Sequence, residues 1–365
     1  MSAVRARSEL RELESLTARR EFEAVVELGR PLLSKHLTDR DLALVRSYLG
    51  QALCRLVQPL EALAFLPLAR ERFELQNEEW LAVDALDWEA SARGLLEDPT
   101  ALTLEGEALA RCRKLEPRPG QLEARILCHL ANLFVVGRSW SLAITHYEAA
   151  IEAANPVNDL LQLAKTHHGL AMAYQRDGQP AKARRHLDKA LSLYSIESDQ
   201  SAVYRVENDL GDLLLREGHV EAAERHFLKA LAGAEELHIN RRGRGFILGN
   251  LGDVCLRQGR IDQARSYLTQ ALEAGRVFGE RIVVADAEML LGKLEEELGN
   301  HRAADGHYLA AIRCLEEIEM PNRLRDSHVE YAQLLEDRGD LSAGYEQLRL
   351  AVATESEAAS RLSAG

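Results

Sequence analysis

Apolar side chains recur at helical spacing along most of this chain. Leu210, Leu213 and Leu214, for example, lie three and four positions apart, which places them on one face of a helix. Gly218 follows this segment, and a second segment of the same kind begins after it. Glycine adopts left-handed backbone angles at little steric cost and therefore often ends a helix. The pattern predicts two helices joined by a tight turn.

This pair of helices repeats with a period of about 40 residues. The turn glycines are Gly178, Gly218, Gly259, Gly299 and Gly339, separated by 40, 41, 40 and 40 residues. Seven positions before each turn stands a small residue, namely Ala171, Gly211, Gly252, Gly292 or Ala332. Nine positions after each turn stands a large one, namely Leu187, Phe227, Leu268, Tyr308 or Leu348. Three positions further on stands an alanine in every copy, namely Ala190, Ala230, Ala271, Ala311 or Ala351.

Weaker copies extend the pattern towards the N-terminus. Arg138 and Val57 take the turn position in two of them, and further copies surround Glu97 and Arg20. Together the copies account for the whole chain as about nine units. A single amphipathic hairpin cannot bury its apolar face alone, so stability must come from stacking neighbouring units. We therefore predict an all-α fold, a right-handed α-solenoid of about nine helix-turn-helix hairpins.

The repeated columns resemble the tetratricopeptide repeat, whose usual unit has about 34 residues rather than the 40 found here. The resemblance is clear over residues 122–354 and weak over residues 1–121, and residues 355–365 are expected to form the end of a capping helix or a tail. Forty-residue units are similar to those of bacterial regulators and of adaptors that hold peptides. The resemblance implies that the first helix of each hairpin lines a concave groove where partners bind.

The resemblance also implies which side chains face that groove. The positions carried over are Asn132, Lys165, His168, Arg205, Asn208, Asp212, Asn250 and Asp253. Asn208, Asp212 and Arg216 lie four positions apart and form one polar stripe along a helix. Asparagine amides suit an extended peptide because they hydrogen-bond its unpaired backbone groups. The alternative is an ordinary solvated helix face, and the aspartates disfavour the capture of an acidic carboxylate.

Composition narrows the function. The formal net charge of −13 disfavours direct binding of nucleic acid, which needs a basic surface. The N-terminal residues show no apolar signal region, and no segment reaches the length of a membrane span, so we expect a cytoplasmic protein. The five cysteines are odd in number and form no CxxC pair, which favours buried thiols over disulfides or zinc. No cofactor is expected.

Two groups of residues could suggest a metal site or a phosphate site, but the repeat and the loop position explain them. A histidine column (His146, His186, His226 and His307) follows the repeat, and its members are too far apart to share one metal ion. The basic run at positions 240–245 reads as a loop between hairpins rather than a phosphate site, because no strand precedes it. None of the common catalytic motifs is present, so we predict a protein that is not an enzyme.

Three functional hypotheses follow. The first is a non-enzymatic interaction module that binds a peptide or a helix of a partner protein in its groove. The alternative is the sensory module of a bacterial regulatory system that responds to a signalling peptide or a small molecule. A homo-oligomer formed through the terminal repeats is a third hypothesis, because the last unit carries apolar residues with no further unit to cover them: Leu341, Leu348 and Val352.

Overall fold

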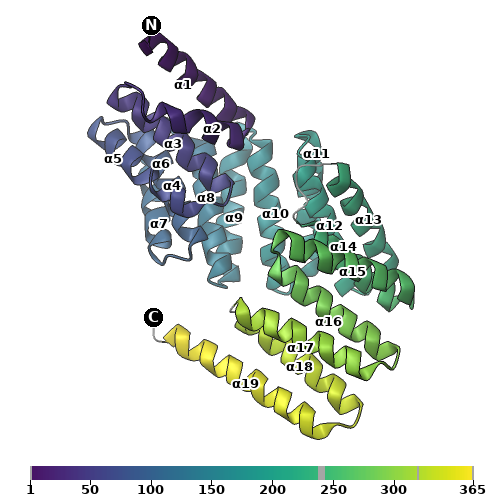
Figure 1. Ribbon diagram of the computed structural model, residues 1–365. Coiled ribbons are helices and arrows are strands. Elements are labelled where there is room, and N and C mark those ends of the chain that lie inside the picture. The colour runs from purple at the N-terminus through teal and green to yellow at the C-terminus, as the bar shows by residue number, and fades with distance from the viewer. Residues whose placement is uncertain (1, 237–242, 319, 364–365) are drawn as a thin grey trace. The chain divides into compact units, whose positions relative to one another are not determined.

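The computed structural model describes residues 2–236, 243–318 and 320–363, which contain helices and no strand. The helices group into two compact units, Met1–Glu197 and Ser198–Gly365. Each unit is built from antiparallel pairs of helices that are consecutive in the chain, as Figure 1 shows. The predicted all-α solenoid of helical hairpins is therefore confirmed.

The first unit begins with short, irregular hairpins and ends with regular ones. Its helices are α1 (Ser2–Arg19), α2 (Phe22–Leu32), α3 (Asp39–Arg55), α4 (Pro59–Leu63), α5 (Leu66–Leu75), α6 (Glu79–Leu95), α7 (Thr100–Cys112), α8 (Gly120–Val136), α9 (Trp140–Ala154), α10 (Leu160–Arg176) and α11 (Pro180–Ile196). A short 3-10 helix at Asn155–Val157 follows α9. In the copy with Val57 at its turn, the second helix is broken into α4 and α5 near Pro67, a residue without the backbone N–H that a continuous helix needs.

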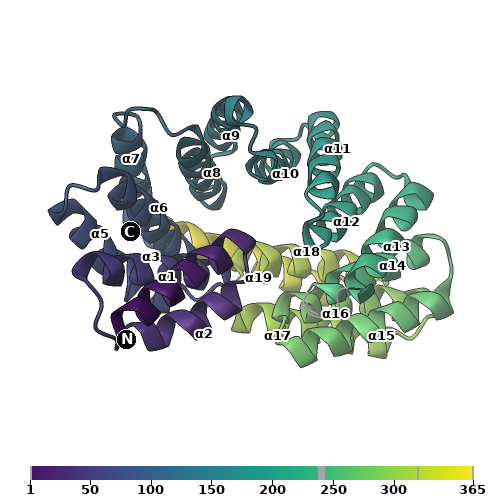
Figure 2. The same cartoon turned by 90° about the horizontal axis from the view of Figure 1, so that it is seen from above.

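The second unit is regular throughout. Its helices are α12 (Gln200–Arg216), α13 (Val220–Glu236), α14 (Arg244–Arg257), α15 (Ile261–Phe278), α16 (Arg281–Glu297), α17 (His301–Glu317), α18 (Pro321–Asp337) and α19 (Leu341–Ser363). The second helix of each hairpin packs on the first helix of the next, and Figure 2 shows this succession from α12 to α17. First helices also contact one another, α12 with α14 and α14 with α16.

The turn position has the same backbone conformation in the regular and the weak copies. The five turn glycines have φ between 70° and 88°. Arg138, Glu97, Val57 and Arg20 occupy the same position in the weaker copies, with φ between 56° and 63°. This left-handed conformation is costly for residues other than glycine. The register predicted for the weak copies is therefore correct.

The small and large columns fit together inside each hairpin. A Cβ atom added to Gly211 would lie 2.5 Å from the Phe227 ring, and one added to Gly292 would lie 2.8 Å from the Tyr308 ring. Phe227 and Tyr308 are almost completely buried. The absence of a side chain on the first helix thus makes room for a large residue on the second, which explains why both columns repeat.

The histidine column forms hydrogen bonds across the hairpins. His226 Nδ1 lies 2.6 Å from Glu207, and His307 Nδ1 lies 2.6 Å from Glu288. His186 Nδ1 meets His167 Nδ1 at 2.9 Å. In these three pairs the partner stands on the first helix, 19 residues earlier. His146 differs, because its Nδ1 contacts the Leu142 carbonyl of its own helix. Three members of the column therefore join the two helices of their hairpins.

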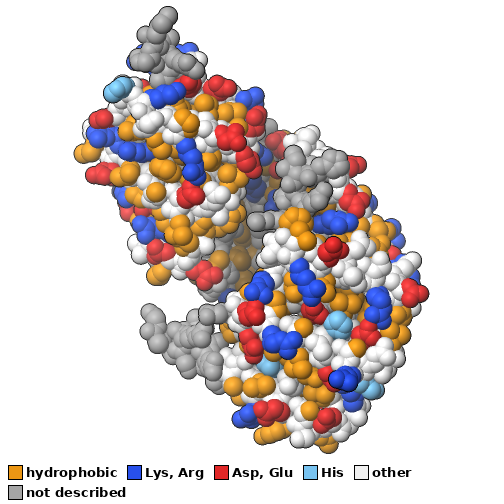
Figure 3. Space-filling model, viewed as in Figure 1, with side chains coloured by type: hydrophobic (Ala, Val, Ile, Leu, Met, Phe, Trp, Pro, Cys, Tyr) orange, Lys and Arg blue, Asp and Glu red, His pale blue; other side chains and the backbone are white. Residues whose placement is uncertain are grey.

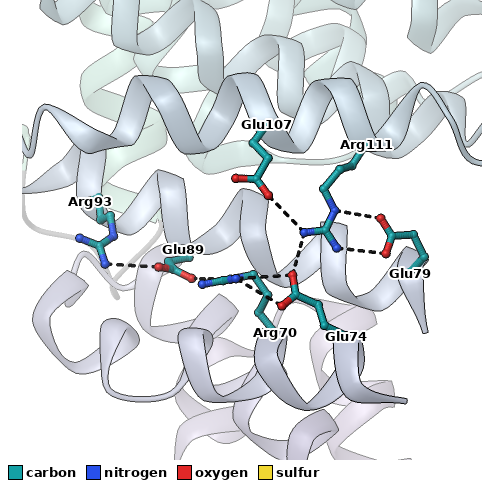
Figure 4. Close-up of polar contacts among 7 residues, drawn as sticks. All are labelled: Arg70, Glu74, Glu79, Glu89, Arg93, Glu107 and Arg111. Atoms are coloured by element: carbon teal, nitrogen blue, oxygen red, sulfur yellow. Dashed lines mark hydrogen bonds and ion pairs between the residues drawn. The ribbon is translucent and has the colours of Figure 1, made fainter. Parts of the chain in front are cut away.

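Charged side chains of both signs are interspersed on the visible faces in Figure 3. In the first unit several of them form a network around Arg111, shown in Figure 4. Arg111 on α7 donates to Glu79 at 2.8 and 3.0 Å and to Glu74 at 2.7 Å, and so joins α7 to α5 and α6. The exposed edge of these irregular hairpins is thus held by ion pairs in addition to apolar packing.

The described residues also bear on several other expectations from the sequence. All five cysteines are buried free thiols. No helix in the described ranges is long and apolar enough to cross a bilayer. Of the basic run, residues 240–242 lie outside the described residues, and Arg244 begins α14 with an ion pair to Glu235 at 3.3 Å. Helix α19 continues to Ser363. The division at residues 121 and 354 remains a prediction.

Candidate functional site

The first helices of the second unit line a cavity of about 290 Å³. Each contributes one stripe at helical spacing: positions 246, 249, 250 and 253 on α14, and positions 286, 289, 290 and 293 on α16. Arg323, Asp326, Ser327 and Glu330 on α18 complete the wall. The two stripes are one 40-residue period apart, so the same face of each first helix is used.

Both apolar and polar side chains line this cavity. Phe246, Val283, Met289, Leu290 and Leu315 supply apolar surface. The polar groups are Asn250, Asp253, Asp286, Lys293, Arg323, Asp326, Ser327 and Glu330. An apolar surface with a few fixed polar groups is typical of ligand sites, where the polar groups set the orientation of the ligand.

Two of the predicted asparagines form a ladder between neighbouring first helices. The Asn250 side-chain amide on α14 donates to Asn208 Oδ1 on α12 at 3.0 Å. Both side chains are partly buried. This bond does not use the Asn250 carbonyl oxygen or the Asn208 NH₂ group, which are one acceptor and one donor. The pair therefore presents the two kinds of group that pair with a peptide backbone.

The two predicted aspartates are each bound to an arginine one turn further along. Asp212 accepts from Arg216 at 2.9 Å, and Asp253 accepts from Arg257 at two distances of 3.1 Å. Arg257 also reaches the Leu215 carbonyl at 3.5 Å and so contacts α12. Surface pairs of this kind contribute little to stability, and a ligand can exchange with them at low cost.

Arg205 is exposed, and its Nε donates to the Ser201 carbonyl at 3.2 Å on its own helix. It belongs to α12, and it is not among the residues that line the cavity. Of the five residues predicted in the second unit, Asn250 and Asp253 line the cavity directly, and Asn208 meets Asn250.

Ion pairs across α16 and α18 were not predicted. Arg323 donates to both oxygens of Asp286, at 2.6 and 2.9 Å. Lys293 lies 3.1 Å from Glu330. Partial burial raises the pKa of the Asp286 carboxyl, and the Arg323 guanidinium opposes that rise. The helical spacing of Asp286, Met289, Leu290 and Lys293 was the available signal, since it copies the spacing of the α14 stripe.

The other three predicted residues belong to the first unit. Asn132 on α8 accepts a hydrogen bond from the Tyr147 hydroxyl. His168 on α10 lies edge-on to the Tyr194 ring, with centroids 6.3 Å apart. Lys165, also on α10, is largely buried, and burial lowers its pKa to about 7, with Arg55 adding to the effect. They do not line the cavity, whose walls all belong to the second unit.

Comparison with known families identifies the repeats. Residues 122–196 and 201–276 match the model of the tetratricopeptide repeat. These residues belong to the tetratricopeptide repeat family, which confirms the resemblance seen in the sequence. No curated protein sequence matches the chain.

Several solved structures share the fold along nearly the whole chain. The apo form of RapI is 12% identical, with a TM-score of 0.72, and the match covers 97% of this chain and 98% of that one. A Rap protein complexed with competence and sporulation factor is 14% identical, with a TM-score of 0.69 over 98% and 99% of the two chains. The apo quorum sensor NprR from B. thuringiensis is 12% identical, with a TM-score of 0.68 over 96% and 98%. At these identities the likeness concerns the fold.

Proposed function

We propose that this chain is a cytoplasmic, non-enzymatic interaction module whose groove binds an extended peptide or a helix of a partner protein. The observation that carries the proposal is the cavity on α14, α16 and α18, with the Asn208–Asn250 ladder beside it. An extended peptide has unpaired backbone N–H and C=O groups, and the ladder offers an acceptor and a donor for them. The apolar residues of the lining would take a hydrophobic side chain of the same ligand.

The proposal is tested with a phage-displayed library of random peptides, selected on the immobilised full-length chain. A synthetic copy of the enriched peptide is then titrated by calorimetry into the unchanged chain and into the double variant Asn208→Ala, Asn250→Ala. Two hydrogen bonds are lost, so we expect affinity to fall by about tenfold or more. Gln263→Ala, on the second helix α15, removes an amide that does not line the cavity and should leave affinity unchanged. Equal affinity in the double variant would place peptide binding outside this groove.

The alternative function is a sensory module in a bacterial regulatory system. Its support is the shared fold with a Rap protein complexed with competence and sporulation factor and with a quorum sensor. In a sensor, the ligand must favour one arrangement of the helices over another. Small-angle scattering with and without the selected peptide separates the two functions. A changed scattering profile favours the sensor, whereas an unchanged profile at saturating peptide favours a simple binding module.

A further inference from the structure

The first unit contains a buried cluster of metal-binding side chains that the proposed function does not use. Asp87 on α6 and Glu105 on α7 are completely buried, and the His129 side chain on α8 is 13% exposed. One donor atom from each lies within 4.8 Å of the other two. Among the described residues, this is the one group of three or more such side chains with this property.

The distances suit a single small cation. His129 Nδ1 lies 2.8 Å from Asp87 Oδ1 and 3.7 Å from Glu105 Oε1. Ligands held about 2.0–2.2 Å from a tetrahedral zinc ion are roughly 3.4 Å apart. The two separations lie on either side of that value, and the third, between Asp87 and Glu105, is at most 4.8 Å, so side-chain shifts of about an ångström would bring the three atoms into a first coordination shell.

One buried carboxyl group of the cluster also lacks a positively charged partner. Arg125 binds Asp84 and donates to Asp87 Oδ2 at 2.6 Å, which leaves Glu105 without a guanidinium partner. No N–H group of the described residues donates a hydrogen bond to either oxygen of Glu105, and both oxygens are buried beside the Asp87 carboxyl. A buried carboxylate without such a partner is costly and calls for a counter-charge. The Glu105 side chain is therefore an independent sign of a ligand.

We propose that Asp87, Glu105 and His129 bind one divalent transition-metal ion, for which Zn²⁺ has the best-matched donor preferences. Imidazole nitrogen favours zinc and its neighbours over magnesium and calcium, which prefer oxygen donors. Three protein ligands leave a fourth position for water. The surroundings hold the ligands in place, because Trp88 packs edge-on against His129 at 5.5 Å and Arg125 binds Asp87. His129 is not a member of the histidine column, whereas Glu105 stands at the equivalent position of the copy around Glu97.

The ion would join helices of two hairpins, α6 and α7 of one and α8 of the next. Binding to the folded state alone raises stability in proportion to the logarithm of the metal concentration over its dissociation constant. The expected role is therefore to stabilise the packing of these hairpins. This inference is independent of peptide binding in the second unit.

The test uses the full-length chain after treatment with EDTA. We expect one equivalent of Zn²⁺ to bind in competition with a chromophoric chelator, and to raise the melting temperature by several degrees, whereas Mg²⁺ at the same concentration should not. Glu105→Gln keeps the shape but removes the charge, and should weaken Zn²⁺ binding at least tenfold. Glu107→Gln is the matched control: it lies on the same helix, and its exposed carboxylate binds Arg111 at 3.3 Å. Affinity should be unchanged in this control.

A second measurement needs no substitution in the cluster. Co²⁺ bound to one imidazole and two carboxylates gives a visible d–d spectrum, which an equivalent of Zn²⁺ should abolish. The double variant His167→Leu, His186→Tyr should keep this spectrum, because these two histidines lie on α10 and α11, outside the cluster. Absence of stoichiometric Zn²⁺ binding, or equal affinity in Glu105→Gln, would overturn the proposal. A Glu105→Gln chain that is more stable without metal, together with no response to Zn²⁺, would show that the cluster holds a proton instead.

Discussion

Val57 shows at the scale of one residue how the repeat constrains the backbone. It occupies the turn position between α3 and α4, with φ of 57°, and its side chain is exposed. A β-branched side chain is strained in this left-handed conformation, whereas glycine is not. The regular copies have glycine at the equivalent position.

We predict that Val57→Gly stabilises the chain. The left-handed conformation costs a non-glycine residue about 1–2 kcal/mol, part of which is offset by the greater freedom of glycine in the unfolded chain. The expected gain in the free energy of unfolding is about 0.5–1 kcal/mol, measured by urea denaturation. Val277→Gly is the control, since Val277 has the same 69% exposure but lies within α15, where glycine should cost a few tenths of a kcal/mol. A loss of stability in Val57→Gly would contradict the strain argument.

At the scale of the helix pair, the histidine column links the two helices of a hairpin. The contact between α10 and α11 differs from the others in its partner residue. His226 and His307 each face a glutamate, but His186 faces His167 at a distance of 2.9 Å. Burial lowers the pKa of His167 to about 4, and the neighbouring His186 and Lys189 add to the effect. The pKa of His186 is lowered by burial and by Lys189 and Lys182, with Glu148 opposing. This hairpin therefore requires neutral imidazoles.

This hairpin should lose stability in mild acid. Unfolding restores the pKa of His167 to about 6.5, so the unfolded chain binds more protons between pH 6.5 and pH 4. The stability is fully present above pH 6.5 and is lost as the pH falls towards 4. Between pH 7 and pH 5 the loss should reach about 2 kcal/mol in the free energy of unfolding.

The double variant His167→Leu, His186→Tyr tests this directly. Leu248 and Tyr267 form the equivalent pair in α14 and α15, so the substitution copies a combination that the chain already uses. Urea denaturation at pH 7 and pH 5 should show a smaller loss of stability in the double variant. His36→Tyr, at an exposed position, should leave the pH dependence as it is. An unchanged loss in the double variant would show that other groups cause it.

At the scale of the whole molecule, the fold could be predicted because its determinants are local and periodic. Turn conformation, small residues and large residues recur every 40 positions, and even Arg138 and Val57 were placed correctly by counting from the glycines. The site could be predicted only in part. Asn250 and Asp253 line the cavity. The ion pair between Asp286 and Arg323 was missed, because these residues lie 37 positions apart on two different helices. In the Asp87–Glu105–His129 cluster, Glu105 stands eight positions after the turn residue Glu97, as the column histidines do after theirs, but Asp87 and His129 recur in no column, so the repeat could not show the cluster.

A solenoid also responds to damage differently from a globular domain. Each hairpin touches only its neighbours, so its stability depends on local interactions and on the adjacent interfaces. Gly211→Ala would place a Cβ atom 2.5 Å from the Phe227 ring, which is fully buried between α12 and α13. Overpacking of this kind costs about 1–3 kcal/mol.

We predict that this damage stays local. In Gly211→Ala, hydrogen exchange followed by mass spectrometry should accelerate in α12, α13 and the adjacent α14, while α18 keeps its rates. Gly306→Ala is the control, because Gly306 lies within α17 with no atom within 4 Å of an added Cβ. It should slow exchange slightly, since alanine favours the helix by about 1 kcal/mol. A uniform acceleration across the second unit would show that its hairpins unfold together, and unchanged rates in α12 and α13 would show that the Phe227 ring moves aside.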